Sequence, residues 1–302
     1  METTDVIIVG GGPAGLNAAV VLGRCRRSVL LFDTGSQRNR RSQGMHNYLT
    51  QDGILPANFL RKARKEARKY GVKLVNKGVQ KARRQSDGLF KVTDGDGDEH
   101  FARRLLVATG LRDNLPDLPG MEQYYGRGVH HCPYCDAWEV QDEPLGVYAR
   151  RKNGHELALS LKAWSDDVTL FTDGKNYLTA HQSKLLEANG VKVVTTRIER
   201  LSGDNKALNR VVLRNGEEVA CTALFFVNGY QQQCDLADSF DCRVNRLGSV
   251  LTNRSQQTHI EGLYVAGDAA RDVHFVVVAA AEGAKAGVYI NKDLQQEDLR
   301  RA

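Results

Sequence analysis

The sequence has no apolar stretch near the roughly 20 residues that a membrane-spanning helix needs, which excludes a membrane-embedded fold. Its first residues, Met1 to Asp5, show neither the basic and apolar segments nor the cleavage site of a secretory signal, so we expect a cytoplasmic protein. Only six cysteines occur among 302 residues, too few for a scaffold held by disulfides. A chain of this length is expected to form two domains of about 100–200 residues each.

Acidic residues are scarce between Gln37 and Arg84, where 14 Lys or Arg accompany only two acids. Apolar residues recur at helical spacing over residues 59–70, which predicts an amphipathic helix with a solvated basic side. The functional alternative is that this basic face attracts an acidic protein partner. Basic and aromatic residues are not interleaved, so we do not expect nucleic-acid binding.

Strand and helix patterns alternate along the chain, as in an α/β fold with open, mostly parallel sheets. Two strands and the helix between them are predicted to form a βαβ unit over residues 5–32. Residues 72–93 are predicted to form a small antiparallel meander, and a turn-rich linker at 114–120 marks the first domain boundary. A second α/β set begins at residue 145, and a long helix is expected from Val276 to about Asn291.

A glycine-rich turn follows the first predicted strand and opens the first predicted helix. Gly10, Gly12 and Gly15 fit the GxGxxG pattern, and Asp33 ends the next strand about 20 residues later. The first glycine allows the tight turn, the second lets the backbone approach a pyrophosphate, and the third lets helix and strand pack closely. The pyrophosphate would lie at the positive helix end, and Asp33 would accept hydrogen bonds from a ribose. This pattern predicts a dinucleotide site.

The only closely spaced cysteines are Cys132 and Cys135. A CxxC pair can be half of a zinc site, but His130 and His131 lie too close in sequence to complete an ordinary one. A buried structural pair is a second alternative, and a redox-active dithiol, which we favour, is the third. The thiolate is the reactive form, and an adjacent histidine or a helix N-terminus can lower the pKa of a cysteine enough to populate it.

Several motifs, taken in order, resemble those of the low-molecular-weight thioredoxin-reductase-like flavoproteins. They are Gly10 to Gly15, Val107-Ala108-Thr109-Gly110, Cys132-Pro133-Tyr134-Cys135-Asp136, Gly267-Asp268 and Ala279-Ala280-Ala281-Glu282-Gly283. The resemblance covers nearly the whole chain and implies two Rossmann-like, three-layer ββα domains, the second inserted in the first. It implies a discontinuous FAD-binding domain at residues 1–112 and 245–302, and a redox domain with a vestigial nucleotide-binding fold at 113–244.

The resemblance also implies which residues bind FAD. Asp268 would hold the ribitol, the backbone of Val79 would touch adenine, and His274 would either contact the flavin or cap the last helix. The complete expected set is Gly10, Gly12, Pro13, Ala14, Gly15, Asp33, His46, Asn47, Val79, Ala108, Thr109, Gly110, Gly267, Asp268, His274 and Phe275.

By the same resemblance, Cys135 would face the flavin and exchange electrons with it, while Cys132 would react with the sulfur of a substrate. Asp136 would protonate a leaving thiolate, and it would also be a favourable acid in the first turn of a helix. The family implies a homodimer whose partner is a thioredoxin-like protein or a small dithiol or disulfide.

The second domain departs from familiar thioredoxin reductases where NADPH would bind. Ala149 and Arg151 occupy the first two glycine positions of the expected second GxGxxG, and the Arg151 side chain would lie where the pyrophosphate belongs. No arginine cluster for the 2′-phosphate follows the strand that ends at Phe171. We therefore expect a vestigial nucleotide domain, although Arg150 and Lys152 leave an unusual phosphate pose open.

These features predict an FAD-dependent dithiol/disulfide oxidoreductase for which NADPH is not the usual electron donor. The redox partner of the flavin other than the dithiol or disulfide substrate has several alternatives. One is an acidic protein such as ferredoxin that docks on the basic face. A dithiol oxidase that passes electrons to oxygen is another. An ordinary NADPH-dependent thioredoxin reductase and a non-enzymatic flavin redox sensor also stay open.

Overall fold

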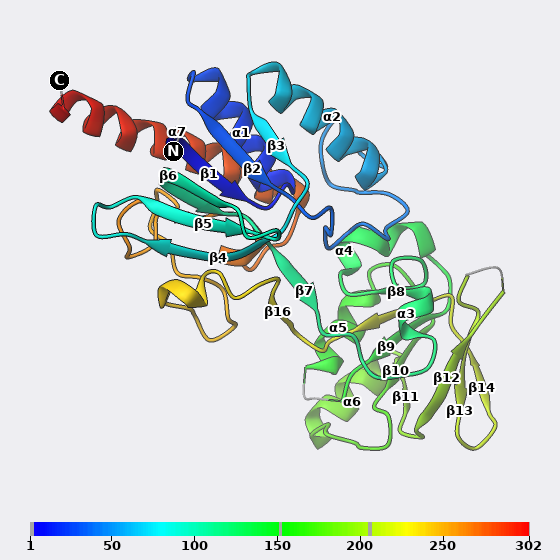
Figure 1. Ribbon diagram of the computed structural model, residues 1–302. Helices are drawn as coiled ribbons and strands as arrows, with labels where there is room; N and C mark the ends of the chain where they lie inside the picture. Colours follow the sequence, from blue (N-terminus) through cyan, green and yellow to red (C-terminus); the bar gives the residue numbers. More distant parts are fainter. Residues whose placement is uncertain (1–2, 151–152, 205–206, 302) are drawn as a thin grey trace. The chain divides into compact units, whose positions relative to one another are not determined.

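The computed structural model describes residues 3–150, 153–204 and 207–301 (Figure 1). The chain separates into two compact units: residues 1–40, 47–112 and 231–302 form unit 1, and residues 41–46 and 113–230 form unit 2. We expected the inserted domain to end at residue 244, whereas residues 231–244 belong to unit 1. The physical reason is that Leu236, Ala237 and Cys242 are buried in the core of unit 1. The functional assignment of each unit stays a prediction.

Unit 1 contains a seven-stranded sheet in the order β3-β2-β1-β6-β5-β4, with β17 paired to β6. Its strands are β1 (Thr3–Val9), β2 (Val29–Phe32), β3 (Lys73–Val75), β4 (Val79–Arg84), β5 (Phe90–Asp94), β6 (Glu99–Val107) and β17 (Leu263–Val265). β4 and β5 continue from the first half of β6 as an antiparallel meander, and the other strands are parallel. We expected β3 in the meander, but it pairs with β2, because Leu74 packs against the core beneath the helices.

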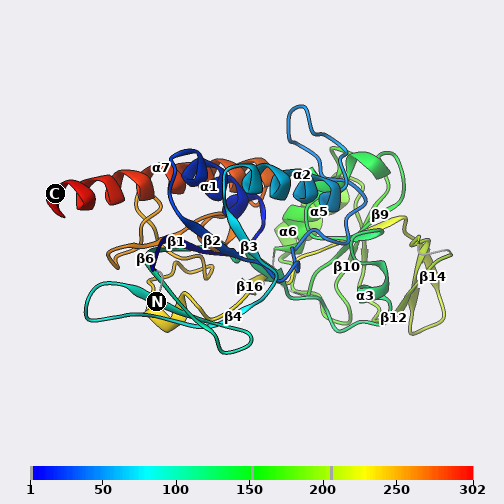
Figure 2. The same ribbon diagram turned by 45° about the horizontal axis from the view of Figure 1, so that its top comes forward.

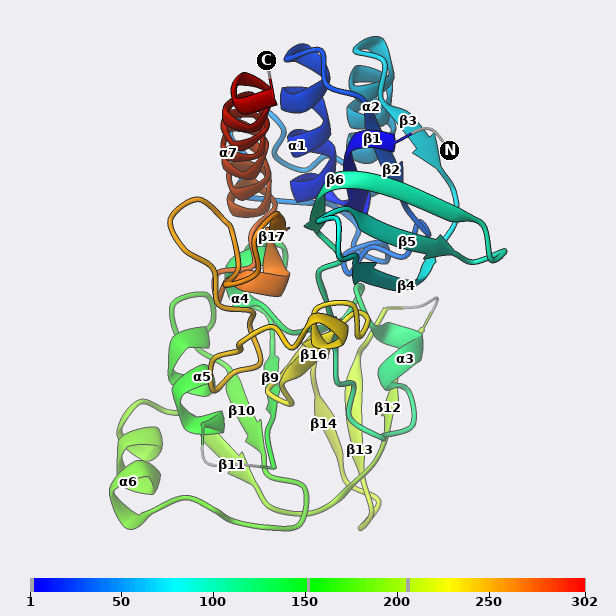
Figure 3. The same ribbon diagram turned by 60° about the vertical axis from the view of Figure 1, so that its left-hand side comes forward.

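Three helices of unit 1 lie side by side in one layer over the parallel strands (Figures 2 and 3). They are α1 (Pro13–Arg24), α2 (Pro56–Lys69) and α7 (Val276–Arg301), and two 3₁₀ turns, η2 (Asp238–Phe240) and η3 (Asp268–Ala270), follow in the loops. Ile8 and Leu31 pack against the helices, whereas Ile7 and Phe32 pack against the meander. The central strands are buried on both faces, which explains their continuous apolar sequence.

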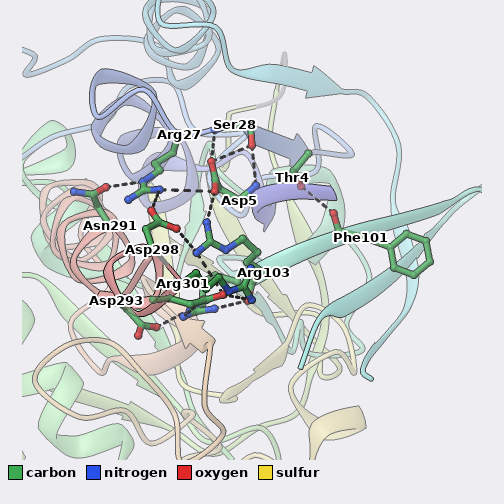
Figure 4. A network of polar contacts seen from close by, with 12 residues as sticks. Thr4, Asp5, Arg27, Ser28, Phe101, Arg103, Asn291, Asp293, Asp298 and Arg301 are labelled. Atoms are coloured by element: carbon green, nitrogen blue, oxygen red, sulfur yellow. Dashed lines mark hydrogen bonds and ion pairs between the residues drawn. The ribbon is translucent and has the colours of Figure 1, made fainter. Parts of the chain in front are cut away.

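Helix α7 continues past its expected end near Asn291 to Arg301. Its last turns carry carboxylates that pair with arginines of β6 and of the α1–β2 turn (Figure 4). The pairs are Asp293–Arg104, Glu297–Arg104, Asp298–Arg103 and Asp298–Arg27. These ion pairs stabilise helical turns whose apolar periodicity is too weak to predict them.

Unit 2 has a five-stranded parallel sheet in the order β11-β10-β9-β15-β8 and a three-stranded antiparallel sheet in the order β12-β13-β14. The parallel strands are β8 (Val129–His130), β9 (Leu145–Tyr148), β10 (Val168–Phe171), β11 (Lys192–Val194) and β15 (Ala223–Phe226). The antiparallel strands are β12 (Ile198–Ser202), β13 (Arg210–Leu213) and β14 (Glu218–Ala220). Its helices are α3 (Met121–Tyr124), α4 (Pro133–Asp136), η1 (Trp138–Val140), α5 (Gly154–Leu161) and α6 (Ala180–Ala188).

Each unit thus combines a parallel sheet, a helical layer and an antiparallel meander, which confirms the predicted pair of Rossmann-like folds. The chain passes between the units four times: on either side of residues 41–46, within β7 (Leu111–Asp113) and within β16 (Tyr230–Gln232). The short strands β7 and β16 pair with each other. Within the described residues, no helix is long and apolar enough to cross a membrane.

Candidate active site

The carboxyl ends of the parallel strands in unit 1 are aligned. Val107 at the end of β6 is paired with Val9 of β1 and with Val265 of β17, and Val9 is paired with the last residue of β2. Ligands of open α/β sheets bind at this edge. The segments that follow these strands are the ones predicted to bind FAD, and they begin at Gly10, Asp33, Ala108 and Ala266.

The glycine-rich turn leaves the N-terminus of α1 accessible to a ligand. Gly12 is the N-cap and Pro13 the first helical residue, and among the described side chains none caps this helix. A Cβ atom at Gly12 would meet no described atom within 4 Å, whereas one at Gly10 would lie 2.2 Å from the carbonyl oxygen of Ala108. The open space over the first turn and its unsatisfied N–H groups fit a pyrophosphate. The residues present therefore fit a dinucleotide such as FAD.

The two acids predicted to bind the cofactor each contact an arginine that the sequence did not single out. Nη2 of Arg64 donates to Oδ2 of Asp33 at 2.6 Å, and Nη1 of Arg38 lies 3.4 Å from Oδ2 of Asp268. Arg64 lies one turn after Leu60, which is on the buried side of α2, so helical spacing could have identified it as the basic residue that points inward.

The C-terminal segment meets the glycine-rich turn through small residues. A Cβ atom at Gly267 would lie 2.9 Å from Cβ of Ala14, so the segment that carries Asp268 approaches α1 closely. Nε2 of His274 lies 2.8 Å from the carbonyl oxygen of Arg271, three residues earlier. His274 therefore contacts the turn before α7, and the two roles that the sequence left open, flavin contact and helix cap, stay predictions.

Three further predicted cofactor residues lie away from the glycine-rich turn in sequence. Val79 begins β4 and lines a cavity of about 840 Å³ in unit 1. Asn47 belongs to unit 1 and has a positive φ of 63°. His46 belongs to unit 2, where its Nε2 lies 3.2 Å from a carboxylate oxygen of Glu139. Their roles as cofactor ligands stay predictions.

The cysteine pair lies at the carboxyl edge of the parallel sheet in unit 2. β8 ends at His130, which is paired with Phe225 of β15, and the chain reaches Cys132 two residues later. Cys132 and Cys135 are joined by a disulfide, their Cα atoms are 5.3 Å apart, and both are half-buried. Cys132 is the N-cap of α4. In the described part of the chain, no three His, Cys, Asp or Glu side chains are grouped as a metal site would require.

Two histidines precede the disulfide and contact different carboxylates. Nδ1 of His130 lies 3.3 Å from Oδ1 of Asp136, and Nδ1 of His131 lies 3.6 Å from Oδ2 of Asp113. The hydroxyl of Tyr125 donates to the same oxygen of Asp113 at 2.5 Å. Successive residues of an extended chain point to opposite sides, which explains the different partners. Sequence reasoning missed Asp113 and Tyr125, because no spacing rule relates the last residue of a short strand and a tyrosine at a helix end to a CxxC motif.

Two exposed aromatic side chains flank the disulfide. Tyr134, between the cysteines, is 65% exposed, and Trp138, which starts η1, is 67% exposed. The Tyr134 ring contacts Trp164 edge-on, with ring centroids 5.6 Å apart. A partly accessible disulfide beside exposed aromatic surface suits exchange with a sulfur compound or with a protein that covers this surface.

The second predicted nucleotide turn keeps its helix–strand packing. Ala149, after β9, is buried, and a Cβ atom at Gly154 would lie 2.4 Å from Cβ of Ala149. The third glycine position thus still serves close packing, although alanine stands in the first. Arg151 and Lys152, on which part of our prediction depends, lie outside the described residues.

The acid after β10 is engaged by donors of the protein itself. Asp173 accepts from the hydroxyl of Tyr148 at 3.1 Å and from the backbone N–H of Ile198 at 2.9 Å, and Nε of Arg150 lies 3.6 Å away. Burial, together with this carboxylate, raises the pKa of Tyr148 to about 12, so its hydroxyl stays protonated and donates. Arg197, which the sequence did not suggest, packs against the next glycine of this loop.

The chain belongs to the pyridine nucleotide-disulphide oxidoreductase family, which it matches over residues 4–283. It is 29% identical to a probable thioredoxin reductase of Arthroderma benhamiae, over 99% of this chain and 82% of that protein. The putative thioredoxin reductase TrxB from Bacillus anthracis superposes with a TM-score of 0.93 at 32% identity, covering 98% of this chain and 99% of that one. HlmI superposes with a TM-score of 0.95 at 36% identity, covering 99% and 95%. The protein is thus an FAD-dependent disulfide oxidoreductase of the thioredoxin-reductase-like type.

Proposed function

We propose that Cys132 and Cys135 exchange two electrons with the disulfide or dithiol of a thioredoxin-like protein or a small molecule. The observation that carries this proposal is the partly accessible Cys132–Cys135 disulfide at the start of α4, directly followed by Asp136. The relatives named thioredoxin reductase support a thioredoxin-like partner. The exposed Tyr134 and Trp138 supply apolar surface that such a partner would cover.

The chemistry at the cysteine pair is thiol–disulfide exchange. A substrate thiolate attacks the sulfur of Cys132, the Cys132–Cys135 bond breaks, and Cys135 leaves as a thiolate. The second substrate sulfur attacks the mixed disulfide and displaces Cys132, so the substrate leaves as a disulfide and the enzyme holds two thiols. Asp136 accepts the proton of the incoming thiol and returns it to a leaving sulfur. Bound FAD supplies the two-electron exchange that resets the pair, and the same steps run in reverse for a disulfide substrate.

We infer that FAD is held at the carboxyl edge of the parallel sheet in unit 1. The accessible N-terminus of α1 at Gly12 would take the pyrophosphate, and Asp33 would take a ribose hydroxyl. Asp268, close to Ala14 through Gly267, would hold the ribitol.

We infer that NADPH is not the usual electron donor. Ala149 replaces the glycine of the tight turn, and the donors of Tyr148 and Ile198 already engage the Asp173 carboxylate. Arg150 lies close to the same acid and is the residue on which an unusual phosphate pose would depend. Oxygen and an acidic protein such as ferredoxin are the alternative redox partners.

A specific surface favours the acidic protein. On α2 the basic side chains that face solvent are Arg61, Lys62, Lys65, Arg68 and Lys69. Among the described carboxylates, none lies within ion-pair distance of these five side chains, so their charge is available for long-range attraction. The apolar side of α2, which includes Leu60 and Ala67, is buried in the core of unit 1 and is not available for a lipid surface.

Anaerobic mixing of the purified yellow protein tests these proposals. A dithiol should remove the visible flavin absorption, and Cys135→Ser should abolish this reaction, whereas the matched variant Cys234→Ser should react like the parent.

NADPH at millimolar concentration should reduce the flavin slowly. Bleaching within milliseconds would instead make this an ordinary NADPH-dependent thioredoxin reductase. Peroxide formed from dithiol in air would identify an oxidase, and salt-sensitive bleaching by reduced ferredoxin would support the acidic donor. If no donor bleaches the flavin, the remaining interpretation is a non-enzymatic redox sensor.

Sedimentation at several protein concentrations tests the homodimer that the family resemblance implies.

A further inference from the structure

We propose that His130 is a positioning residue that fixes the Asp136 carboxylate for proton transfer at the cysteine pair. The inference rests on the acid–base role proposed above for Asp136. The sequence named His130 only as a zinc ligand lying too close to the cysteine pair, and its contact with Asp136 follows only from the structure.

The His130 ring is held in one place by the sheet of unit 2. His130 is 7% exposed and is paired with Phe225, the neighbouring residue of β15. The two rings lie 5.5 Å apart with an interplanar angle of 33°. A ring packed in this way at the end of a strand has little freedom to rotate.

The carboxylate that His130 meets is more exposed and less restrained. Asp136 is the last residue of the single-turn helix α4, and its side chain is 19% exposed. Nδ1 of His130 lies 3.3 Å from its Oδ1. The two groups lie within ion-pair distance, so the buried ring limits the positions that the Asp136 carboxylate can take.

The position of Asp136 matters because proton transfer requires close approach. A general acid or base acts within hydrogen-bond distance of the group it protonates, and a displacement of about 1 Å can lower a rate by roughly 100-fold. In the exchange reaction, the carboxylate takes one proton from the substrate thiol and gives one proton to a cysteine sulfur. His130 gains and loses no proton in this step, so it acts only through the position of Asp136.

The neighbouring histidine is engaged elsewhere, which allows separate tests. His131 and Tyr125 both contact the carboxylate of Asp113, whereas His130 contacts the carboxylate of Asp136. Substitution of His130 therefore leaves the Tyr125–Asp113 hydrogen bond in place.

The decisive experiment is a double-mutant cycle on the FAD-loaded protein. The oxidised enzyme is mixed anaerobically with dithiothreitol, quenched with acid and alkylated. Mass spectrometry counts the thiols formed at Cys132 and Cys135, and the loss of flavin absorption counts the electron pairs passed on to FAD. We expect Asp136→Asn to lower the rate about 100-fold or more. His130→Leu should lower it about 10-fold or more. In the Asp136→Asn background, His130→Leu should cause no further loss.

Two further variants separate positioning from a structural role. His130→Asn places an amide nitrogen where Nδ1 lies and should restore most of the rate, whereas His130→Gln places it where Nε2 lies and should not. The exposed His259, changed to leucine, is the control for the loss of any histidine.

The outcomes distinguish this inference from the proposal beneath it. An Asp136→Asn variant with the parental rate overturns the acid–base role itself. If that variant is slow but His130→Leu matches His259→Leu, the positioning role is wrong. It is also wrong if the His130→Leu effect persists in the Asp136→Asn background, or if Asn and Gln at position 130 behave alike.

Discussion

Replacing Arg104 with leucine should lower the free energy of unfolding of unit 1 by about 2–3 kcal/mol, a value between those typical of buried and exposed ion pairs. Its Nε lies 2.6 Å from Asp293 and its Nη2 lies 2.8 Å from Glu297, while only 12% of the side chain is exposed. Burial alone would lower the pKa of Arg104, but the hydrogen bond and charge of Asp293 outweigh it, so the pKa is raised. The guanidinium thus stays charged, and its removal deprives two partly buried carboxylates, Asp293 and Glu297, of a cationic partner.

The magnitude follows from the exposure of the partners. Breaking a fully buried pair costs about 3–5 kcal/mol, and breaking an exposed pair costs about 0–1 kcal/mol. The Asp293 and Glu297 side chains are 30% and 22% exposed, and the hydroxyl of Tyr264 still donates to Asp293 after the substitution. These facts place the cost between the two limits.

Thermal unfolding measures the effect against a matched control. Arg301 also pairs with Glu297 but is 67% exposed, so Arg301→Leu should cost about 0.5 kcal/mol or less. A loss of 1 kcal/mol lowers the midpoint by about 2–4 °C in a protein of this size, so Arg104→Leu should melt about 4–12 °C below the parent. Equal midpoints for the two leucine variants would refute the reasoning.

Three other predictions concern the cofactor, acid stability and thiol reactivity. Gly12→Val should leave the fold intact, since a Cβ there meets no described atom, but should remove bound FAD, which the flavin-to-protein ratio measures. Burial raises the pKa of Asp94, but hydrogen bonds from the backbone of its own loop and from Lys77 outweigh burial and hold the pKa well below its usual range. Its stabilising effect is therefore complete above about pH 4 and lost as pH falls further, so Asp94→Asn should flatten the acid limb of stability measured by urea unfolding. Burial raises the pKa of Cys221 to about 12, so peptide mapping after alkylation at neutral pH should find the exposed Cys25 labelled well before Cys221.

Local patterns in the sequence predicted much of the framework. Short apolar runs predicted β1 and β9, and the glycines from Gly10 to Gly15 predicted the turn into α1, because strand burial and helix entry depend on neighbouring residues. The CxxC motif likewise identified the cysteine pair without knowledge of the fold. Such features are encoded within a few residues, so the chain alone is sufficient to recognise them.

The features that sequence reasoning missed depend on pairing between distant segments. β3 pairs with β2 rather than with the meander, and the last turns of α7 form because their acids meet Arg103 and Arg104. In the site, Arg64 contacts Asp33 across 31 positions of sequence. No local periodicity specifies which charged residue will meet which partner, so these contacts required the three-dimensional structure.

The cysteine pair and the altered nucleotide turn lie at one edge of a sheet, and this has a consequence for how tolerant the protein is to change. Tyr148 at the end of β9 is paired with Phe226 of β15, so Ala149 and the segment after β8 extend from the same carboxyl edge. The exposed positions of these loops, unlike the buried Ala149, add little to the packing of the strands beneath them. A library of substitutions should therefore tolerate few changes in the strands and many at the exposed loop positions, and new electron donors or substrates could be accommodated there while the underlying sheet stays the same.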